Sequence, residues 1–178
     1  FGIKPDDIGE GLRRFATPPH RCEPAGSIGS VRFINDSKAT NPHAALAGVK
    51  GTELHGEECL VWIGGGSDKQ SDFSALTQEI ARRAHTAVVC GATAPQLISA
   101  LNAAQGACQV VQASDLHSAI ALAWQHAQPH GCVLFSPACA SFDFFQSYAH
   151  RGEVFKQAVE RLRAAVTPSK ENLTAAAD

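Results

Sequence analysis

Charged and hydroxyl side chains gather in one short loop, NDSKATN, at positions 35–41. Asp36 is suited to accept hydrogen bonds from ribose hydroxyls, and Lys38 is suited to neutralise a phosphate. Thr40, together with the free backbone N–H groups at the start of a following helix, can hold an anion. The loop therefore indicates a nucleotide or anion site. A solvated turn that ends in an asparagine cap is the alternative interpretation of the same residues.

A second loop, GGGSDK at positions 64–69, combines glycines with a cation. Consecutive glycines let the backbone approach a ligand closely, and Lys69 offers a point charge for a carboxylate or a phosphate. The spacing matches neither the Walker A motif nor the G-x-G-x-x-G dinucleotide motif. A tight turn between a strand and a helix is the alternative interpretation.

A third loop, SPACASFD at positions 136–143, consists mainly of small residues. Small side chains leave backbone N–H groups accessible, and Ser141 adds a hydroxyl, so the loop can bind a carboxylate. Cys139 lacks the Cys–His signature of a catalytic thiol, and we expect it to be structural. Arg21, at the start of a predicted hairpin, can stack on a planar base.

Short apolar runs that alternate with helical patterns place these loops at the ends of strands. Runs rich in Val and Ile are typical of strands that are buried on both faces. The predicted strands are 31–34, 60–63, 86–90, 109–112 and 133–136, with a hairpin over 21–32. The predicted helices are 42–49, 73–84, 94–104, 115–128 and 152–166, with Asp72 and Ser114 as N-caps.

This alternation predicts an α/β fold. We expect a Rossmann-like three-layer domain with a mostly parallel sheet of about five or six strands, an N-terminal hairpin and helices on both faces. Ligands bind such sheets beyond the carboxyl ends of the strands, which is where all three loops are expected. The tail from 167 to 178 is rich in Ala, Ser and Thr, and we expect it to be disordered.

Composition narrows the class of protein. The 178 residues suit one domain, and the net charge of −2 argues against a nucleic-acid-binding tail or a polybasic membrane anchor. The chain has no signal-peptide layout and no apolar run of about 20 residues. Six scattered cysteines without a C-x-x-C pair indicate reduced thiols and a cytoplasmic protein. The histidines form no H-E-x-x-H motif, and no metal site is expected on this chain.

Five motifs, in this order and spacing, resemble the C-terminal domain of the Mur ligases. They are HR at 20–21, NDSKATN at 35–41, GGSDK at 65–69 followed by DF at 72–73, SPACASFD at 136–143, and HRGEVF at 150–155. The resemblance runs from about Arg13 to Ala164 and is strongest to the members that add D-glutamate. The Asp-Asn-Pro-Arg motif typical of the members that add a diamino acid is missing.

The resemblance implies an ATP- and magnesium-dependent ligase that joins D-glutamate to UDP-N-acetylmuramoyl-L-alanine in peptidoglycan precursor synthesis. ATP would phosphorylate the carboxylate of the UDP-linked substrate, and the amine of D-glutamate would attack the acyl phosphate. Such enzymes have three domains, and we assign residues 1–166 to the third. The chain has no methionine, and its first eight residues read as mid-chain sequence. We therefore expect a domain that lacks the UDP-binding and ATPase domains and is inactive alone.

The resemblance also implies a role for each loop. Arg21 and Asp36 would contact ATP, with Asp36 on the ribose. Lys38 would be the catalytic residue, beside the phosphates and the forming bond. The residues implied to bind D-glutamate are Thr40, Lys69, Ser141, Phe142 (through its backbone N–H) and Tyr148, which stands where the family often has Phe.

Other functions stay open at this point. A sister Mur ligase or a folylpolyglutamate-synthase relative would hold a different amino acid in the same loops. A stand-alone Rossmann-like binding module would share the fold without the catalysis. A P-loop, G-x-x-x-x-G-K-[ST], encoded upstream in the same reading frame would exclude the stand-alone module.

Overall fold

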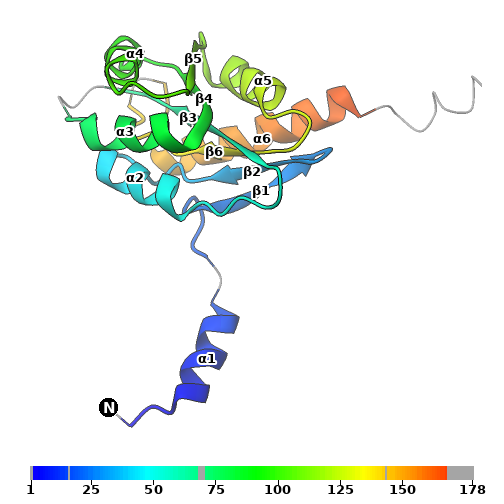
Figure 1. The fold of residues 1–178 in the computed structure, drawn as a ribbon. Helices are drawn as coiled ribbons and strands as arrows, with labels where there is room; N and C mark the ends of the chain where they lie inside the picture. The colour runs from blue at the N-terminus through cyan, green and yellow to red at the C-terminus, as the bar shows by residue number, and fades with distance from the viewer. Residues whose placement is uncertain (1, 16, 68–70, 143, 168–178) are drawn as a thin grey trace, which may run out of the picture.

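The computed structural model describes residues 2–15, 17–67, 71–142 and 144–167. Within these residues, the body is a six-stranded sheet in the order β1-β2-β6-β3-β4-β5 (Figure 1). β1 runs antiparallel to β2, and the other neighbouring pairs are parallel. The strands are β1 (Glu23–Ile28), β2 (Val31–Asn35), β3 (Cys59–Gly64), β4 (Ala84–Val89), β5 (Gln109–Gln112) and β6 (Gly131–Phe135).

Helices cover both faces of the sheet (Figure 1). One face carries α2 (Pro42–Gly51), α3 (Ser74–Arg83) and α4 (Ala94–Ala103), and the other carries α5 (Leu116–His126) and α6 (Tyr148–Val166). The central strands β3 and β6 are apolar because they meet helices on both sides. Alternate residues enter different cores: Val61 packs with α5 and α6, whereas Trp62 packs with α2 to α4.

The predicted three-layer α/β fold is confirmed. All five predicted strands are present, and their bounds shift by at most two residues. The predicted hairpin is formed by β1 and β2. The last helix starts at Tyr148 rather than at residue 152, because the Ser147 hydroxyl caps its first turn by accepting a hydrogen bond from the His150 N–H.

Neither predicted N-cap is correct. Asp115, not Ser114, caps α5: its carboxylate accepts from the Ser118 N–H, and the Ser118 hydroxyl accepts from the Asp115 N–H. This capping box satisfies two backbone donors, which a single serine cannot do. Asp72 lies one residue before the N-cap of α3, Phe73, and accepts a hydrogen bond from the first N–H of that helix.

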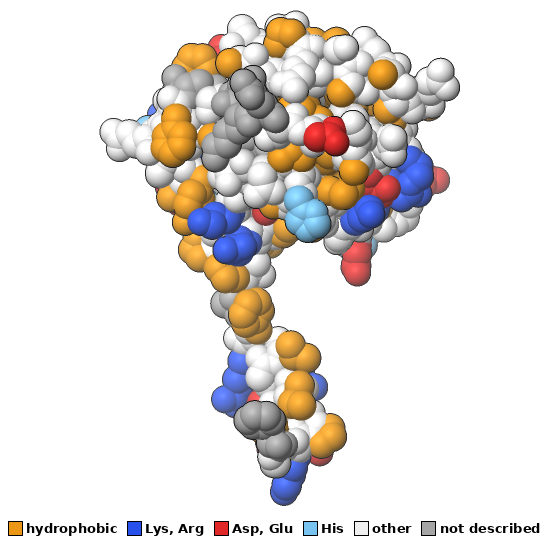
Figure 2. Space-filling view, turned by 90° about the vertical axis from the view of Figure 1, so that its left-hand side faces the viewer, with side chains coloured by type: hydrophobic (Ala, Val, Ile, Leu, Met, Phe, Trp, Pro, Cys, Tyr) orange, Lys and Arg blue, Asp and Glu red, His pale blue; other side chains and the backbone are white. Residues whose placement is uncertain are grey.

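One helix, α1 (Pro5–Arg14), was not predicted. It contains two glycines, which weaken a helical pattern. Its signals are Pro at the first position, Asp6 and Asp7 in the first turn, and Arg13 and Arg14 in the last turn. None of its residues is buried, and Figure 2 shows hydrophobic side chains along one side of it.

Three further expectations concern membrane spans, the cysteines and the C-terminal tail. No helix within the described residues is long and apolar enough to cross a membrane. All six cysteines carry thiols rather than disulfides, as predicted. The predicted disorder of the tail falls on residues 168–178, which lie outside the described residues.

Candidate functional site

The loops that follow β2 and β6 lie side by side at the carboxyl edge of the sheet. β2 and β6 are parallel neighbours, with Asn35 opposite Phe135. The Asp36 N–H donates to the Phe135 carbonyl (2.8 Å), and the Ala138 N–H donates to the Ala39 carbonyl (3.0 Å). The structure therefore brings together the first and third loops of the sequence analysis.

The loop after β3 joins them from the other side of β6. The Gly65 N–H donates to the Pro137 carbonyl (2.8 Å). Gly65 and Gly66 have φ values of +115° and +151°, and a Cβ on Gly66 would lie 2.4 Å from the Ala140 carbonyl oxygen. Glycine is therefore required for this close approach. Lys69 lies outside the described residues, so its role stays a prediction.

A cavity of about 360 Å³ lies between the loop after β2 and helix α2. Its polar lining includes Arg21, Asp36 and Lys38, the three residues implied to contact ATP or its phosphates. Small residues of α2, among them Gly48, form the opposite wall. A Cβ on Gly48 would lie 2.7 Å from Asp36 Oδ2, so the helix backbone sits directly against the carboxylate. We call this space the nucleotide cavity.

Asp36 is a buried carboxylate held by two donors. The Ser136 hydroxyl donates to Oδ2 (2.7 Å) and the Cys22 N–H donates to Oδ1 (3.2 Å). Burial raises the pKa of Asp36 above its ordinary value, while these hydrogen bonds and the charge of Arg21 act in the opposite direction. A carboxylate oriented in this way is a suitable acceptor for ribose hydroxyls.

His20 fixes the backbone at the entrance of the nucleotide cavity. It is buried with φ of +63°, and its carbonyl accepts from the Lys38 N–H (3.0 Å). Its ring Nδ1 is hydrogen-bonded to Asn35 Nδ2 (3.0 Å). A Cβ on Gly152 of α6 would lie 2.2 Å from the same ring nitrogen, so the ring fits only beside glycine. These contacts place the next residue, Arg21, at the cavity.

A smaller cavity of about 180 Å³ lies between the loops after β2 and β6 and the start of α6. Four of the five residues implied to bind D-glutamate line it: Thr40, Ser141, Phe142 and Tyr148. Ser141 is buried, whereas Phe142 is 76% exposed, which is compatible with a contribution through its backbone N–H. We call this space the amino-acid cavity.

Lys38 lies at the boundary between the two cavities. It lines the nucleotide cavity, and its Nζ lies 3.7 Å from the centre of the Tyr148 ring, which lines the amino-acid cavity. A cation over an aromatic face is stabilised by about 0.5–1 kcal/mol at exposed sites. The ring therefore holds the ammonium between the two spaces.

Buried side chains anchor the third loop from the core. The Trp62 indole N–H donates to the Ser136 carbonyl (2.9 Å). Cys139 is 4% exposed, and its Sγ lies 3.4 Å from Thr93 Oγ1. These contacts support a structural rather than a nucleophilic role for Cys139.

The structure adds Arg151, to which the sequence analysis assigned no role beyond its place in the fifth motif. Its guanidinium is buried and donates to backbone carbonyls of both loops. Arg151 precedes Phe155 by four residues and Ala158 by seven, so it shares the core-facing stripe of α6. That spacing is the signal that could have identified it.

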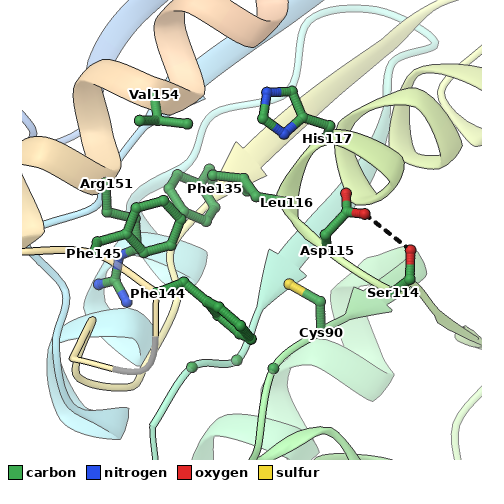
Figure 3. A pocket seen from close by; sticks show the side chains of 13 residues that line it. Cys90, Ser114, Asp115, Leu116, His117, Phe135, Phe144, Phe145, Arg151 and Val154 are labelled. Carbon is green, nitrogen blue, oxygen red and sulfur yellow. Dashed lines mark hydrogen bonds between the residues drawn. The ribbon is translucent and has the colours of Figure 1, made fainter.

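A third cavity, of about 260 Å³, lies at the same edge of the sheet and is mainly apolar. Its aromatic wall lies on the side of Arg151, across from Ser114, Asp115 and His117 (Figure 3). The aromatic residues are Phe135, Phe144 and Phe145. Of the described residues implied to bind ATP or D-glutamate, none lines this cavity, so we place neither substrate there.

Known sequences are similar to this chain over most of its length. The family described as "Mur ligase, glutamate ligase domain" matches residues 20–139. The UDP-N-acetylmuramoylalanine–D-glutamate ligase of Pelotomaculum thermopropionicum is 40% identical over 163 residues, which are 92% of this chain and 35% of that enzyme. The ligase of the same name from Aromatoleum aromaticum is 43% identical over 165 residues, 91% of this chain and 34% of the enzyme. The chain thus spans about a third of the length of these relatives.

Solved structures share the fold at lower identity. The UDP-N-acetylmuramate-alanine ligase MurC of Thermotoga maritima aligns with a TM-score of 0.61 and 16% identity, over 92% of this chain and 34% of that chain. A folylpolyglutamate synthase of Mycobacterium tuberculosis aligns with a TM-score of 0.58 and 19% identity, over 94% of this chain and 37% of that chain. At such identities the likeness concerns the fold alone.

Proposed function

Since this chain belongs to the Mur ligase family, as its glutamate ligase domain, we propose that it is the C-terminal, amino-acid-binding domain of an ATP-dependent ligase. The reaction we propose joins D-glutamate to UDP-N-acetylmuramoyl-L-alanine in the cytoplasm, as a step of peptidoglycan precursor synthesis. Relatives that carry this ligase name, 40% and 43% identical to the chain, support the choice of substrate.

The observation that carries the proposal is that Lys38, which lines one cavity, contacts Tyr148, which lines the other. The nucleotide cavity contains Arg21 and Asp36, and the amino-acid cavity contains Thr40 and Ser141. The ammonium of Lys38 lies between them, on the ring of Tyr148. A ligase that activates a carboxylate with ATP and then joins it to an amine needs its phosphate and amine sites to meet in this way.

Each residue then has a proposed task. Asp36 accepts hydrogen bonds from the ribose, and Arg21 stacks on the base. Lys38 neutralises charge on the phosphate of the acyl phosphate. The amine of D-glutamate attacks the acyl carbon, so that a C–N bond forms, the C–O bond to phosphate breaks, and phosphate and a proton leave.

The two carboxylates of D-glutamate explain why the amino-acid cavity needs several donors. Lys69, the hydroxyls of Thr40 and Ser141, and the backbone N–H of Phe142 are the proposed partners. Charge-assisted hydrogen bonds of this type contribute about 1.5–3 kcal/mol each.

Magnesium is assigned to no residue of this chain. Within the described residues, no group of three or more His, Cys, Asp or Glu side chains is placed to hold a metal ion. We propose that the ion, the P-loop and the UDP-binding site belong to domains outside this chain. The isolated domain is then inactive, and its activity is tested in the full-length polypeptide.

The test is phosphate release by the full-length protein with ATP, Mg²⁺ and UDP-N-acetylmuramoyl-L-alanine, against a panel of amino acids. Release that depends on D-glutamate is the expected result. Release with a different amino acid would move the chain to a sister ligase with the same mechanism. No release with any amino acid would favour a non-catalytic binding module.

A substitution in the second loop tests the amino-acid assignment. Lys69→Ala should raise the KM for D-glutamate far more than the KM for ATP, because the proposed partner of Lys69 is a substrate carboxylate. Lys50→Ala, at the far end of α2, is the matched control and should change neither. An unchanged KM for D-glutamate would remove Lys69 from this role.

A further inference from the structure

The side chain of Arg151 reaches two loops that belong to other parts of the chain. Its Nη1 donates to the carbonyls of Cys139 (3.0 Å) and Ala140 (3.1 Å), in the loop after β6. Its Nε donates to Ser37 Oγ (3.1 Å), and its Nη2 donates to the Ser37 carbonyl (2.9 Å), in the loop after β2. The residue is 2% exposed, so these bonds form away from bulk water.

These two loops are walls of the amino-acid cavity. Thr40 lies on the loop after β2, Ser141 lies on the loop after β6, and Tyr148 at the start of α6 forms the third wall. The Ser37 hydroxyl, which accepts from Arg151, donates to the Tyr148 carbonyl (2.8 Å). Arg151 is therefore bonded to two of the walls directly and to the third through Ser37.

We propose that Arg151 is a positioning residue that sets the distance between the walls of the amino-acid cavity and so controls affinity for the amino acid. This inference rests on the proposed function. A guanidinium is a planar fork that holds several carbonyl oxygens in one fixed geometry, whereas an ammonium is a compact point donor that cannot span the same partners. Gly66 leaves room for the fork, since a Cβ there would lie 3.3 Å from Nη1.

The kinetic test is Arg151→Lys in the full-length protein. The positive charge is kept and the fork is lost. We expect the KM for D-glutamate to rise by about tenfold or more, as for the loss of at least one charge-assisted hydrogen bond across the cavity. The KM for ATP should rise less than the KM for D-glutamate, because Asp36 is held by Ser136 and Cys22 instead.

Arg83→Lys is the matched control. Arg83 on α3 also donates to backbone carbonyls, those of Val49, Lys50 and Thr52 at the end of α2. Both substitutions should lower the melting temperature, because each removes hydrogen bonds from a guanidinium to backbone carbonyls. Arg83→Lys should nevertheless leave the KM for D-glutamate within about twofold of the wild-type value. Equal KM values for the two variants would overturn the proposal.

Amide hydrogen exchange on the same full-length variants needs no substrate. In Arg151→Lys, the amides of residues 38–41 and 138–141 should exchange faster than in the wild type, because the bonds that hold the two loops are lost. In Arg83→Lys, the faster exchange should lie at residues 49–52. Unchanged exchange in both loops of Arg151→Lys would refute the positioning role, whichever amino acid the enzyme uses.

Two outcomes keep this proposal separate from the proposed function. If the wild-type protein uses a different amino acid, the KM for that amino acid replaces the KM for D-glutamate, and the exchange result stands alone. If Arg151→Lys does not fold, Ser37→Ala removes the hydroxyl that links Arg151 to Tyr148. It should raise the amino-acid KM by about threefold to tenfold, and an unchanged KM would overturn the proposal.

Discussion

The close approach of α2 to Asp36 makes Gly48→Ala a sharp test of the nucleotide cavity. In an ordinary helix interior this change is favourable by about 0.5–1 kcal/mol, because glycine loses more conformational freedom on folding than alanine does. Here the added Cβ would lie 2.7 Å from Asp36 Oδ2 and 3.2 Å from Ser136 Oγ. A contact under 3.0 Å essentially never occurs at a Cβ, so the carboxylate has to move.

The size of the effect follows from what Asp36 would lose. Its displacement strains the bond from the Ser136 hydroxyl (2.7 Å) and the bond from the Cys22 N–H (3.2 Å). Overpacking of this kind costs about 1–3 kcal/mol, which outweighs the gain in helix propensity. We expect a net loss of about 1–2 kcal/mol in the free energy of unfolding. A displaced carboxylate also weakens the proposed ribose contact, which should raise the KM for ATP about tenfold.

Gly51→Ala is the matched control, because Gly51 lies in the same helix and has nothing within 4 Å of an added Cβ. It should leave the KM for ATP unchanged and should not destabilise the domain. The free energy of unfolding is measured by denaturant titration of this chain, and the KM for ATP by phosphate release in the full-length protein. If Gly48→Ala and Gly51→Ala agreed in both quantities, the argument that Gly48 holds Asp36 in place would be refuted.

Three further substitutions test the fold and the two cavities. Glu58→Gln should destabilise the chain by about 1 kcal/mol at neutral pH, because hydrogen bonds from Arg32 hold the pKa of Glu58 below its ordinary value. That stabilisation is lost as the pH falls through the lowered pKa, so the free energies of unfolding of the wild type and Glu58→Gln, from denaturant titrations, should converge in acid. A difference that persists in acid would contradict the pairing. Tyr148→Phe should keep the KM for D-glutamate within about twofold of the wild-type value. Tyr148→Leu should raise it by about twofold to fivefold, because the ring under the Lys38 ammonium is lost. Equal KM values for the two variants would argue against a role of the ring. Asp36→Asn should raise the KM for ATP. Burial raises the pKa of the folded carboxylate, so the stability of this variant relative to the wild type should improve as the pH rises above 3.8. A difference in melting temperature that stays flat across the acid range would count against that burial.

Much of the fold could be predicted because its signals are local. The buried strands β3 and β6 are short apolar runs bounded by loop residues, and such runs are visible without knowledge of their neighbours. The hairpin and the helix patterns are local as well. The errors are also local: the capping box at Asp115 competes with Ser114 for the same helix end, and α1 combines good end signals with glycines that hide its pattern.

The candidate site could be predicted only in part. Asp36, Lys38 and Ser141 were recognisable by their types at predicted strand ends, and the family motifs suggested their roles. Only the structure shows that Arg21, Asp36 and Lys38 line one cavity. Only the structure shows that the Lys38 ammonium lies over the Tyr148 ring. Their side chains meet only after the loops have packed.

The order of strands and helices along the chain follows from the linear sequence, because each element depends on neighbours within a few residues. The linear sequence also indicated the class of chemistry, through the resemblance of five motifs between residues 20 and 155 to those of a known family. The order of strands across the sheet does not follow from it. β2 pairs with β6, which is distant in the chain, because the choice of partner depends on how all the buried faces pack at once. That pairing brings Asp36 onto Ser136 and lets Arg151 bond both loops. Burial of these polar groups is a property of the packed molecule, and it turns a set of loop residues into two adjoining cavities.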